Sequence, residues 1–278
     1  MSFSLAHAGW SAGIEPESGG SLSRLEWNGM SVLRPAAPGT RNPLQMASFP
    51  LVPYANRIAQ GRFGEHRLPR NFGAHPHTLH GNGWQSEWTA QAEGEGRLRL
   101  LLDHRGGEAW PWSYDAEQEI ELLAGVARFR IELTNRGSRP MPAGLGFHPY
   151  FPLHAQTRLM AHAAAVWLSD DQQLPVRRAS AVHFGDWASG APVAGSGLID
   201  NVYEGWNGFA RISQPGYRLD LAATGARAFH LYRPEGGDFF CFEPVSHLPD
   251  AHNRQEFALD MLQPGESLAL AMRISISG

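Results

Sequence analysis

Residues 267–277 read Ser-Leu-Ala-Leu-Ala-Met-Arg-Ile-Ser-Ile-Ser, and this stretch carries the plainest fold signal in the chain. Its large apolar side chains occupy every second position, at Leu268, Leu270, Met272, Ile274 and Ile276. Alternation of this kind is typical of a β-strand that buries one face and exposes the other. The sequence therefore predicts a half-buried strand here.

The same alternation returns elsewhere, with turn signals between the apolar runs. Phe129, Ile131 and Leu133 alternate with charged or polar residues. Asn28-Gly29 between two apolar runs predicts a type I′ hairpin, and residues 234–238 (Pro-Glu-Gly-Gly-Asp) separate two further strand-like runs. No stretch predicts a long amphipathic helix, so a doubly wound or barrel architecture of alternating strands and helices is not favoured. The predicted fold class is all-β, a large antiparallel β-sandwich.

Composition narrows the classes of function. With 278 residues, 42% of them apolar, the chain has material for one large core, and we predict a single domain over residues 1–278. A net charge of −4 without basic clusters argues against nucleic acid and membrane surfaces as partners. Met1–Trp10 lacks a signal-peptide pattern, and the single cysteine, Cys241, fits a reducing compartment, so we expect a cytoplasmic protein.

Residues 53–63 and 75–84 place polar groups among aromatic and glycine residues. Arg57 offers a guanidinium fork to sugar hydroxyls, although such an arginine is more often a partner in a structural ion pair. The triplet His75, His77 and His80 allows a transition-metal site, because alternating histidines share one face of a strand. Glycines after His80 predict a loop that brings the backbone close to a ligand, and Trp84 is interpreted either as a sugar platform or as a core residue.

Two later segments combine one ionisable group with aromatic neighbours. His148 lies within residues 144–151, Gly-Leu-Gly-Phe-His-Pro-Tyr-Phe, and Glu243 ends the strongly apolar run that starts at Phe239. A carboxylate at the end of such a strand is costly to bury without a partner, which favours a functional role for Glu243 over a solvated one.

Taken in order along the chain, these segments resemble motifs of the aldose 1-epimerase (galactose mutarotase) family. The matching segments are Asn56-Arg57-Ile58, Leu79-His80-Gly81, residues 147–151, Leu198-Ile199-Asp200-Asn201, Glu243 with residues 249–253, and residues 262–266 near the C-terminus. Each motif alone is weak, but together they span nearly the whole chain in the expected order.

The resemblance implies a galactose mutarotase-like supersandwich with an open sugar cleft. It implies that Glu243 is the catalytic base, that His148 is the acid, and that Arg57, His80 and Asp200 bind sugar hydroxyls. The implied reaction interconverts the α and β anomers of a free aldose, with no cofactor and no metal. The sequence leaves the aldose and the oligomeric state open.

Electrostatic attraction between the two catalytic groups predicts an ionised Glu243 and a protonated His148. Three alternatives to the epimerase remain at this point. They are a hexose-6-phosphate mutarotase using Arg62, Arg70 or Arg233 as extra cations, a non-catalytic sugar-binding protein, and a cupin-like metal enzyme using the three histidines of residues 75–80.

Overall fold

The computed structural model describes residues 1–277, and it consists of strands joined by turns and short loops. No α-helix occurs in these residues. The helical segments are single 3-10 turns, η1 (Pro43–Gln45), η2 (Ala59–Gly61), η3 (Gly83–Gln85) and η4 (Trp187–Ser189). None of the helices in the described residues is long and apolar enough to cross a membrane. The predicted all-β class is confirmed.

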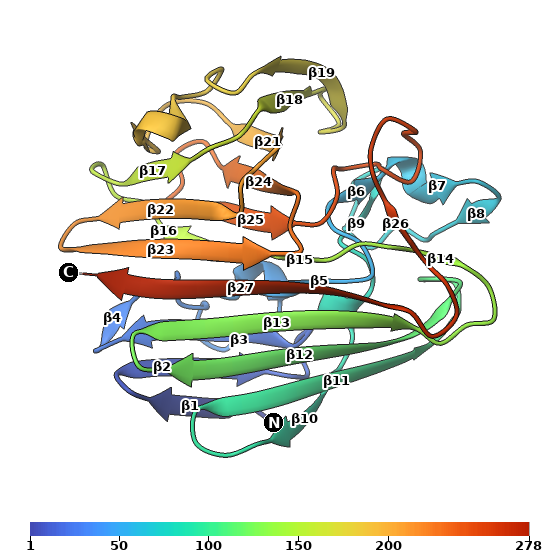
Figure 1. Cartoon of the computed structure of the whole chain (residues 1–278), viewed down its shortest axis with the longest axis horizontal. Coiled ribbons are helices and arrows are strands. Elements are labelled where there is room, and N and C mark those ends of the chain that lie inside the picture. Colours follow the sequence, from blue (N-terminus) through green and yellow to red (C-terminus); the bar gives the residue numbers. More distant parts are fainter. Residues whose placement is uncertain (278) are drawn as a thin grey trace.

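One layer is a nine-stranded antiparallel sheet that runs across the molecule in Figure 1. Its strands, in spatial order, are β10 (Thr89–Ala92), β11 (Arg97–Arg105), β12 (Ser113–Leu123), β13 (Val126–Asn135), β27 (Ser267–Ser277), β23 (Tyr217–Thr224), β22 (Phe209–Gln214), β17 (Arg158–Ala161) and β20 (Ala191–Pro192). The stretch 267–277 is the central strand β27, and Leu270, Met272 and Ile274 are buried as its alternation predicts.

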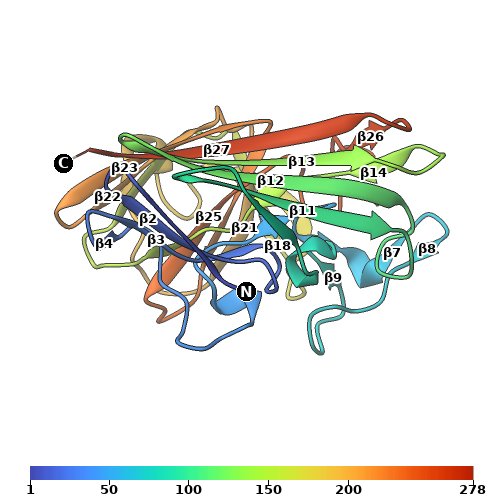
Figure 2. The same cartoon turned by 90° about the horizontal axis from the view of Figure 1, so that it is seen from below.

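The second layer is a sheet of eight strands that lies beneath the first in Figure 2. Its members are β19 (Pro175–Ser180), β18 (Ala165–Ser169), β21 (Ile199–Glu204), β24 (Ala228–Arg233), β25 (Phe239–Val245), β15 (Gly146–Phe147) and β5 (Pro50–Leu51), with β16 (Tyr150–Pro152) also paired to β25. Phe129 of the first sheet meets Phe147 of the second edge to face, with ring centroids 6.3 Å apart. The two layers thus form the predicted sandwich.

Four smaller sheets accompany the two large ones in the described residues. They are β1 (Phe3–His7) to β4 (Met30–Ser31) with β2 (Trp10–Glu15) and β3 (Ser21–Trp27) between them, β14 (Met141–Ala143) with β26 (Asp260–Leu262), β6 (Arg57–Ile58) with β9 (Thr78–Leu79), and β7 (Arg62–Phe63) with β8 (His66–Arg67). Asn28 and Gly29 join β3 to β4 with φ values of 49° and 77°, as a type I′ turn requires.

The central strands of the eight-stranded sheet are buried on both faces, and this decides where the polar groups gather. Phe229 and Leu231 of β24 and Phe240 and Phe242 of β25 belong to the main core between the sheets. The residues between them necessarily point to the opposite face, because side chains alternate along a strand. That opposite face carries the polar cluster described next.

Candidate active site

Three neighbouring strands bring Asp200, His230 and Glu243 to one face of the eight-stranded sheet. His230 of β24 lies directly opposite Glu243 of β25, and Val202 of β21 lies opposite His230. Asp200 is two residues before Val202 and therefore shares its face. The register between adjacent strands thus brings together three polar residues that are separated in the sequence.

His148 reaches the same cluster from the turn between β15 and β16. Its backbone N–H donates to the Phe49 carbonyl oxygen at 3.0 Å. Its imidazole is sandwiched between the rings of Phe49 and Tyr150, with centroid distances of 4.5 and 4.8 Å. Aromatic packing on both sides fixes the orientation of the ring, so His148 is held for interaction with Glu243.

The cluster lines a hollow of about 390 Å³ that contains every site residue predicted from the sequence. Those residues are Arg57, His80, His148, Asp200 and Glu243. All five are buried, with less than a tenth of each residue's surface exposed. The structure therefore brings the five together, although it does not by itself assign their roles.

The shortest contact between the two predicted catalytic groups joins His148 Nε2 to Glu243 Oε1 at 3.4 Å. Burial raises the pKa of Glu243 well above its ordinary value, and the nearby Asp200 carboxylate raises it further. Burial also lowers the pKa of His148 to about 3. The expectation of a charged pair was wrong, because loss of hydration outweighs the attraction between the two groups.

Arg57 and Asp200 form a buried ion pair in the pocket. Arg57 Nη2 donates to Asp200 Oδ2 at 2.9 Å, and Nη1 lies 3.4 Å from Oδ1. His230 Nε2 lies 2.6 Å from the same Oδ1, and its Nδ1 lies 3.3 Å from the Asn56 amide nitrogen. Burial opposes ionisation of Asp200, but the combined effect of Arg57 and His230 holds its pKa below the ordinary value. Arg57 is thus both an ion-pair partner and a pocket residue.

His80 is held by an exchange of hydrogen bonds with Asn56. The His80 N–H donates to the Asn56 carbonyl at 2.8 Å, and His80 Nδ1 accepts from the Asn56 N–H at 3.0 Å. Because Nδ1 is an acceptor, the neutral ring carries its proton on Nε2. Burial lowers the pKa of His80 well below 6.5, which agrees with this neutral form.

The glycines after His80 approach Val52 of the protein itself, and neither Gly81 nor Gly83 lines the pocket. Gly81 has φ +73°, and a Cβ on it would stand 2.2 Å from the carbonyl oxygen of Val52. Trp84 is buried in the core, where Nε1 donates to Leu79 O and Gly81 O, both at 3.1 Å. The backbone at Gly81 does come close to another group, and that group is the Val52 carbonyl. Of the two interpretations of Trp84, the structure supports the core residue.

The three histidines of residues 75–80 do not form a metal centre. His75 Nδ1 accepts from the His77 N–H, and His77 Nδ1 accepts from the Gln60 N–H. Among residues 1–277, the group of three potential ligands whose atoms come within 4.8 Å of one another is His148, Cys241 and Glu243. Burial raises the pKa of the Cys241 thiol well above its ordinary value, which disfavours the thiolate that binds metals.

Sequence reasoning missed His230, Tyr150 and Tyr232 as pocket residues. The signal for His230 and Tyr232 was present, because both alternate with Phe229 and Leu231 in a predicted strand. The strand pairing that sets them beside Glu243 was not readable. Arg233, considered as a cation for a phosphorylated sugar, instead donates to the carbonyl oxygens of Val193, Ser196 and Gly197.

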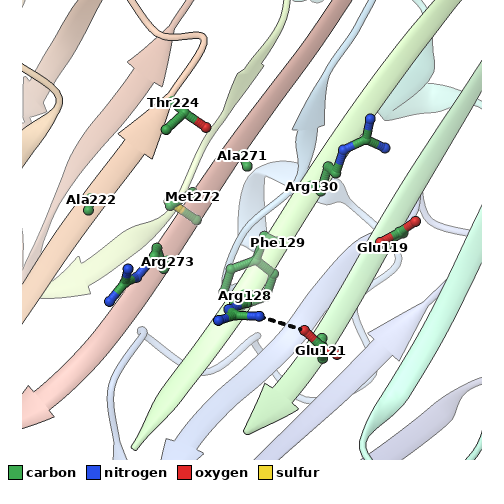
Figure 3. Close-up of a pocket in the computed structure, with 10 residues that line it drawn as sticks. All are labelled: Glu119, Glu121, Arg128, Phe129, Arg130, Ala222, Thr224, Ala271, Met272 and Arg273. Carbon is green, nitrogen blue, oxygen red and sulfur yellow. Dashed lines mark hydrogen bonds and ion pairs between the residues drawn. The ribbon is translucent and has the colours of Figure 1, made fainter.

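A second hollow, of about 420 Å³, lies on the outer face of the nine-stranded sheet (Figure 3). Its acidic and basic side chains include the ion pair between Arg128 and Glu121 at 3.4 Å. Arg130, Arg273 and Glu119 also line it, but none of its described lining residues is a histidine or a buried carboxylate. It offers no acid–base pair among these residues, so the pocket around Glu243 is the candidate active site.

Comparison with known proteins agrees with the geometry. Residues 1–275 match the family model of aldose 1-epimerase. The chain is 36% identical over 251 residues to "Uncharacterized protein YphB" of Escherichia coli K12, covering 82% of this chain and 83% of that protein.

Solved structures give the same picture. The crystal structure of a "Putative aldose 1-epimerase" from Escherichia coli K12 superposes with a TM-score of 0.92 at 31% identity, over 100% of this chain and 99% of that one. A galactose mutarotase-like protein from Clostridium acetobutylicum has a TM-score of 0.89 at 20% identity, over 100% and 95%, which indicates a shared fold. From the family model and these relatives, the chain belongs to the aldose 1-epimerase family.

Proposed function

We propose that this protein is an aldose 1-epimerase in which Glu243 and His148 move protons at the anomeric centre of a free aldose. The observation that carries the proposal is the 3.4 Å contact between Glu243 Oε1 and His148 Nε2 inside the hollow of about 390 Å³. The anomeric hydroxyl and the ring oxygen are bonded to the same carbon. Two groups this close together therefore reach both oxygens at once.

Ring opening needs one base and one acid. The neutral pair that burial favours becomes a carboxylate and an imidazolium when one proton passes from Glu243 to His148, so both forms hold the same single transferable proton. Glu243 then accepts the proton of the anomeric hydroxyl while His148 gives its proton to the ring oxygen. The bond between C1 and the ring oxygen breaks, and C1 becomes an aldehyde.

Ring closure runs the same transfers backwards. Rotation about the C1–C2 bond presents the other face of the aldehyde to the hydroxyl that was the ring oxygen. His148 takes that hydroxyl proton as the oxygen attacks C1, and Glu243 returns a proton to the carbonyl oxygen. No electron or group leaves the sugar, so the proposed step uses no cofactor and no metal.

The remaining pocket residues are proposed to hold hydroxyls. Asp200, already fixed by Arg57 and His230, is an oriented acceptor, and His80 Nε2–H is an oriented donor. Because Arg57 is already paired with Asp200, its charge is neutralised inside the pocket. Arg57 therefore offers no unpaired cation to a phosphate inside this pocket, which supports contacts with sugar hydroxyls there.

We also propose a single domain and a cytoplasmic location. The main buried cluster runs from Leu5 to Ile274, which supports one folding unit. The single cysteine is a buried free thiol, which agrees with a reducing compartment.

Glu243→Gln tests the proposal, because the amide keeps the size of the carboxylate but cannot take up the hydroxyl proton. The enzyme-dependent rate of anomer exchange, measured by NMR, should fall about 10²-fold to 10⁴-fold. Sugar affinity by calorimetry should change by only about tenfold or less, since one altered hydrogen bond is worth about 0.5 to 1.5 kcal/mol.

Asp200→Asn is the matched control, since it makes the same exchange of carboxylate for amide in the same pocket. It should weaken sugar binding more than Glu243→Gln does. If Asp200→Asn abolishes exchange while Glu243→Gln retains it, Glu243 is not the base. If the wild-type protein binds aldoses but leaves anomer exchange at the spontaneous rate, the protein is a sugar binder and not an epimerase.

A further inference from the structure

The hairpin of β7 and β8 places two arginines side by side. Arg62 pairs with Arg67 across the hairpin, and Phe63 pairs with His66. Phe63 and His66 face the interior, where their rings contact Trp112 at centroid distances of 6.0 and 4.7 Å. Side chains alternate along each strand, so Arg62 and Arg67 share the opposite, outer face.

This pairing is electrostatically unfavourable without a partner. Like charges directly opposite each other in an antiparallel pair destabilise it. Within residues 1–277, no carboxylate lies within ion-pair distance of Arg62, Arg67 or the nearby Arg70, even though Glu65 sits in the hairpin turn. The protein as a whole carries a net charge of −4, so this is a local excess of positive charge.

The three arginines line one hollow of about 460 Å³. Its other lining residues are Gln60, Leu68, Pro76 and Gln172, and none of the described residues that line it is acidic. The amides of Gln60 and Gln172 add neutral donors beside the guanidinium groups. A cavity that offers three cations and two amides, with no anion among these lining residues, is matched to a ligand of high negative charge.

The hollow adjoins the sugar pocket without being part of it. Pro76 and Gln172 line the hollow, whereas their neighbours His75 and Gln173 line the sugar pocket. His75 Nε2 lies 3.5 Å from Gln173 Oε1, so these two side chains meet across the wall between the cavities. None of the three arginines lines the sugar pocket.

We propose that this hollow is a binding site for the phosphate group of a small molecule. Guanidinium groups bind phosphate oxygens through paired, charge-assisted N–H donors, and two facing arginines present such donors to one dianion. The phosphate has one of two sources. It is inorganic phosphate or part of a separate phosphorylated compound, or it belongs to a sugar that lies in the pocket and reaches over the wall. The site does not depend on the proposed epimerase activity, because its binding is measured directly.

Calorimetric titration of the whole protein with inorganic phosphate tests the site, with chloride at equal ionic strength as the reference. Wild-type protein should bind phosphate, and Arg62→Gln combined with Arg67→Gln should weaken binding about tenfold or more. The matched control is Arg177→Gln combined with Arg218→Gln, which removes the same charge from two other exposed arginines. Melting curves of both double variants verify that the fold is retained.

The sources of phosphate are separated by kinetics with glucose and glucose 6-phosphate. If the hollow holds the phosphate of a sugar, the hairpin variant raises KM for glucose 6-phosphate and leaves KM for glucose unchanged. If the ligand is a separate compound, both KM values stay unchanged while phosphate binding is lost. Absence of phosphate binding to the wild type, or equal weakening in both double variants, would overturn the proposal.

Discussion

Glu243 and His148 lose most of their hydration within the pocket, and that loss controls their proton chemistry. The shifts run in opposite directions, since burial raises the pKa of Glu243 and lowers that of His148 to about 3. Both shifts favour neutral groups, so the resting pair holds its one transferable proton on the carboxyl group. A bound sugar hydroxyl that donates to Glu243 stabilises the carboxylate, and this lowers the cost of passing the proton to His148.

The pH dependence of kcat/KM follows from this pair. The acid limb belongs to protonation of His148 and should lie toward pH 3, and the alkaline limb belongs to loss of the carboxyl proton and should lie well above 4.5. Anomer exchange measured from about pH 4 to 8 should therefore not slow as the pH drops through the ordinary histidine value near 6.5. Circular dichroism at each pH corrects for unfolded protein. A fall in kcat/KM as the pH drops through 6.5 would contradict the neutral resting pair.

At the level of elements, the strands could be predicted but their pairing could not. The alternation in residues 267–277 and the turn at residues 234–238 are local patterns, and both were confirmed. The register that sets His230 opposite Glu243 depends on the geometry of that turn. A shift of one residue would send His230 to the core face, so no local pattern settles whether it lies in the pocket.

The same distinction explains the other differences between sequence and structure. Glu243, His148 and Asp200 were found because family motifs mark them, and the structure places all three in one pocket. The ionisation of Glu243 and His148 was mispredicted, because burial is a property of the folded chain. The neighbour of the loop after His80 could not be predicted for a similar reason, since Val52 lies far away in the sequence.

That loop gives a prediction at the scale of elements. Gly81→Ala should destabilise the fold by about 1 to 2 kcal/mol for the left-handed backbone and by about 1 to 3 kcal/mol more for the clash with Val52 O. Gly39→Ala is the control, because Gly39 has a similar φ of +71° but no described atom lies within 4 Å of the point that its Cβ would occupy. Urea unfolding of both variants measures the difference, and equal losses of stability would show that the loop relaxes freely around Val52.

Across the whole molecule, buried histidines link stability to pH. Burial lowers the pKa of His80, His148, His247 and His252, that of His247 to about 4. These rings stay neutral in the folded protein, whereas they take up protons below about 6.5 when it unfolds. Their contribution to stability is therefore complete above about pH 6.5 and is lost as the pH falls, by up to about 1.4 kcal/mol per pH unit for each ring. Glu243 acts oppositely, since its pKa is raised and its contribution falls as the pH rises above 4.5.

His252 isolates this effect, because neither of its ring nitrogens has a hydrogen-bond partner within residues 1–277 and it does not line the sugar pocket. Its ring packs against Phe63 and Tyr54, with centroids 4.9 and 5.4 Å away.

His252→Phe removes two unsatisfied buried nitrogens, worth about 1 kcal/mol or more, and should raise stability at neutral pH. The gain should grow as the pH falls from about 6.5, because the variant loses one of these protonation penalties. Denaturant unfolding at several pH values measures this slope, and His162→Phe, at an exposed histidine, is the control for replacing a histidine by phenylalanine. Parallel slopes for His252→Phe and the wild type would mean that His252 is protonated equally in the folded and unfolded protein, and that burial of its ring does not contribute to acid unfolding.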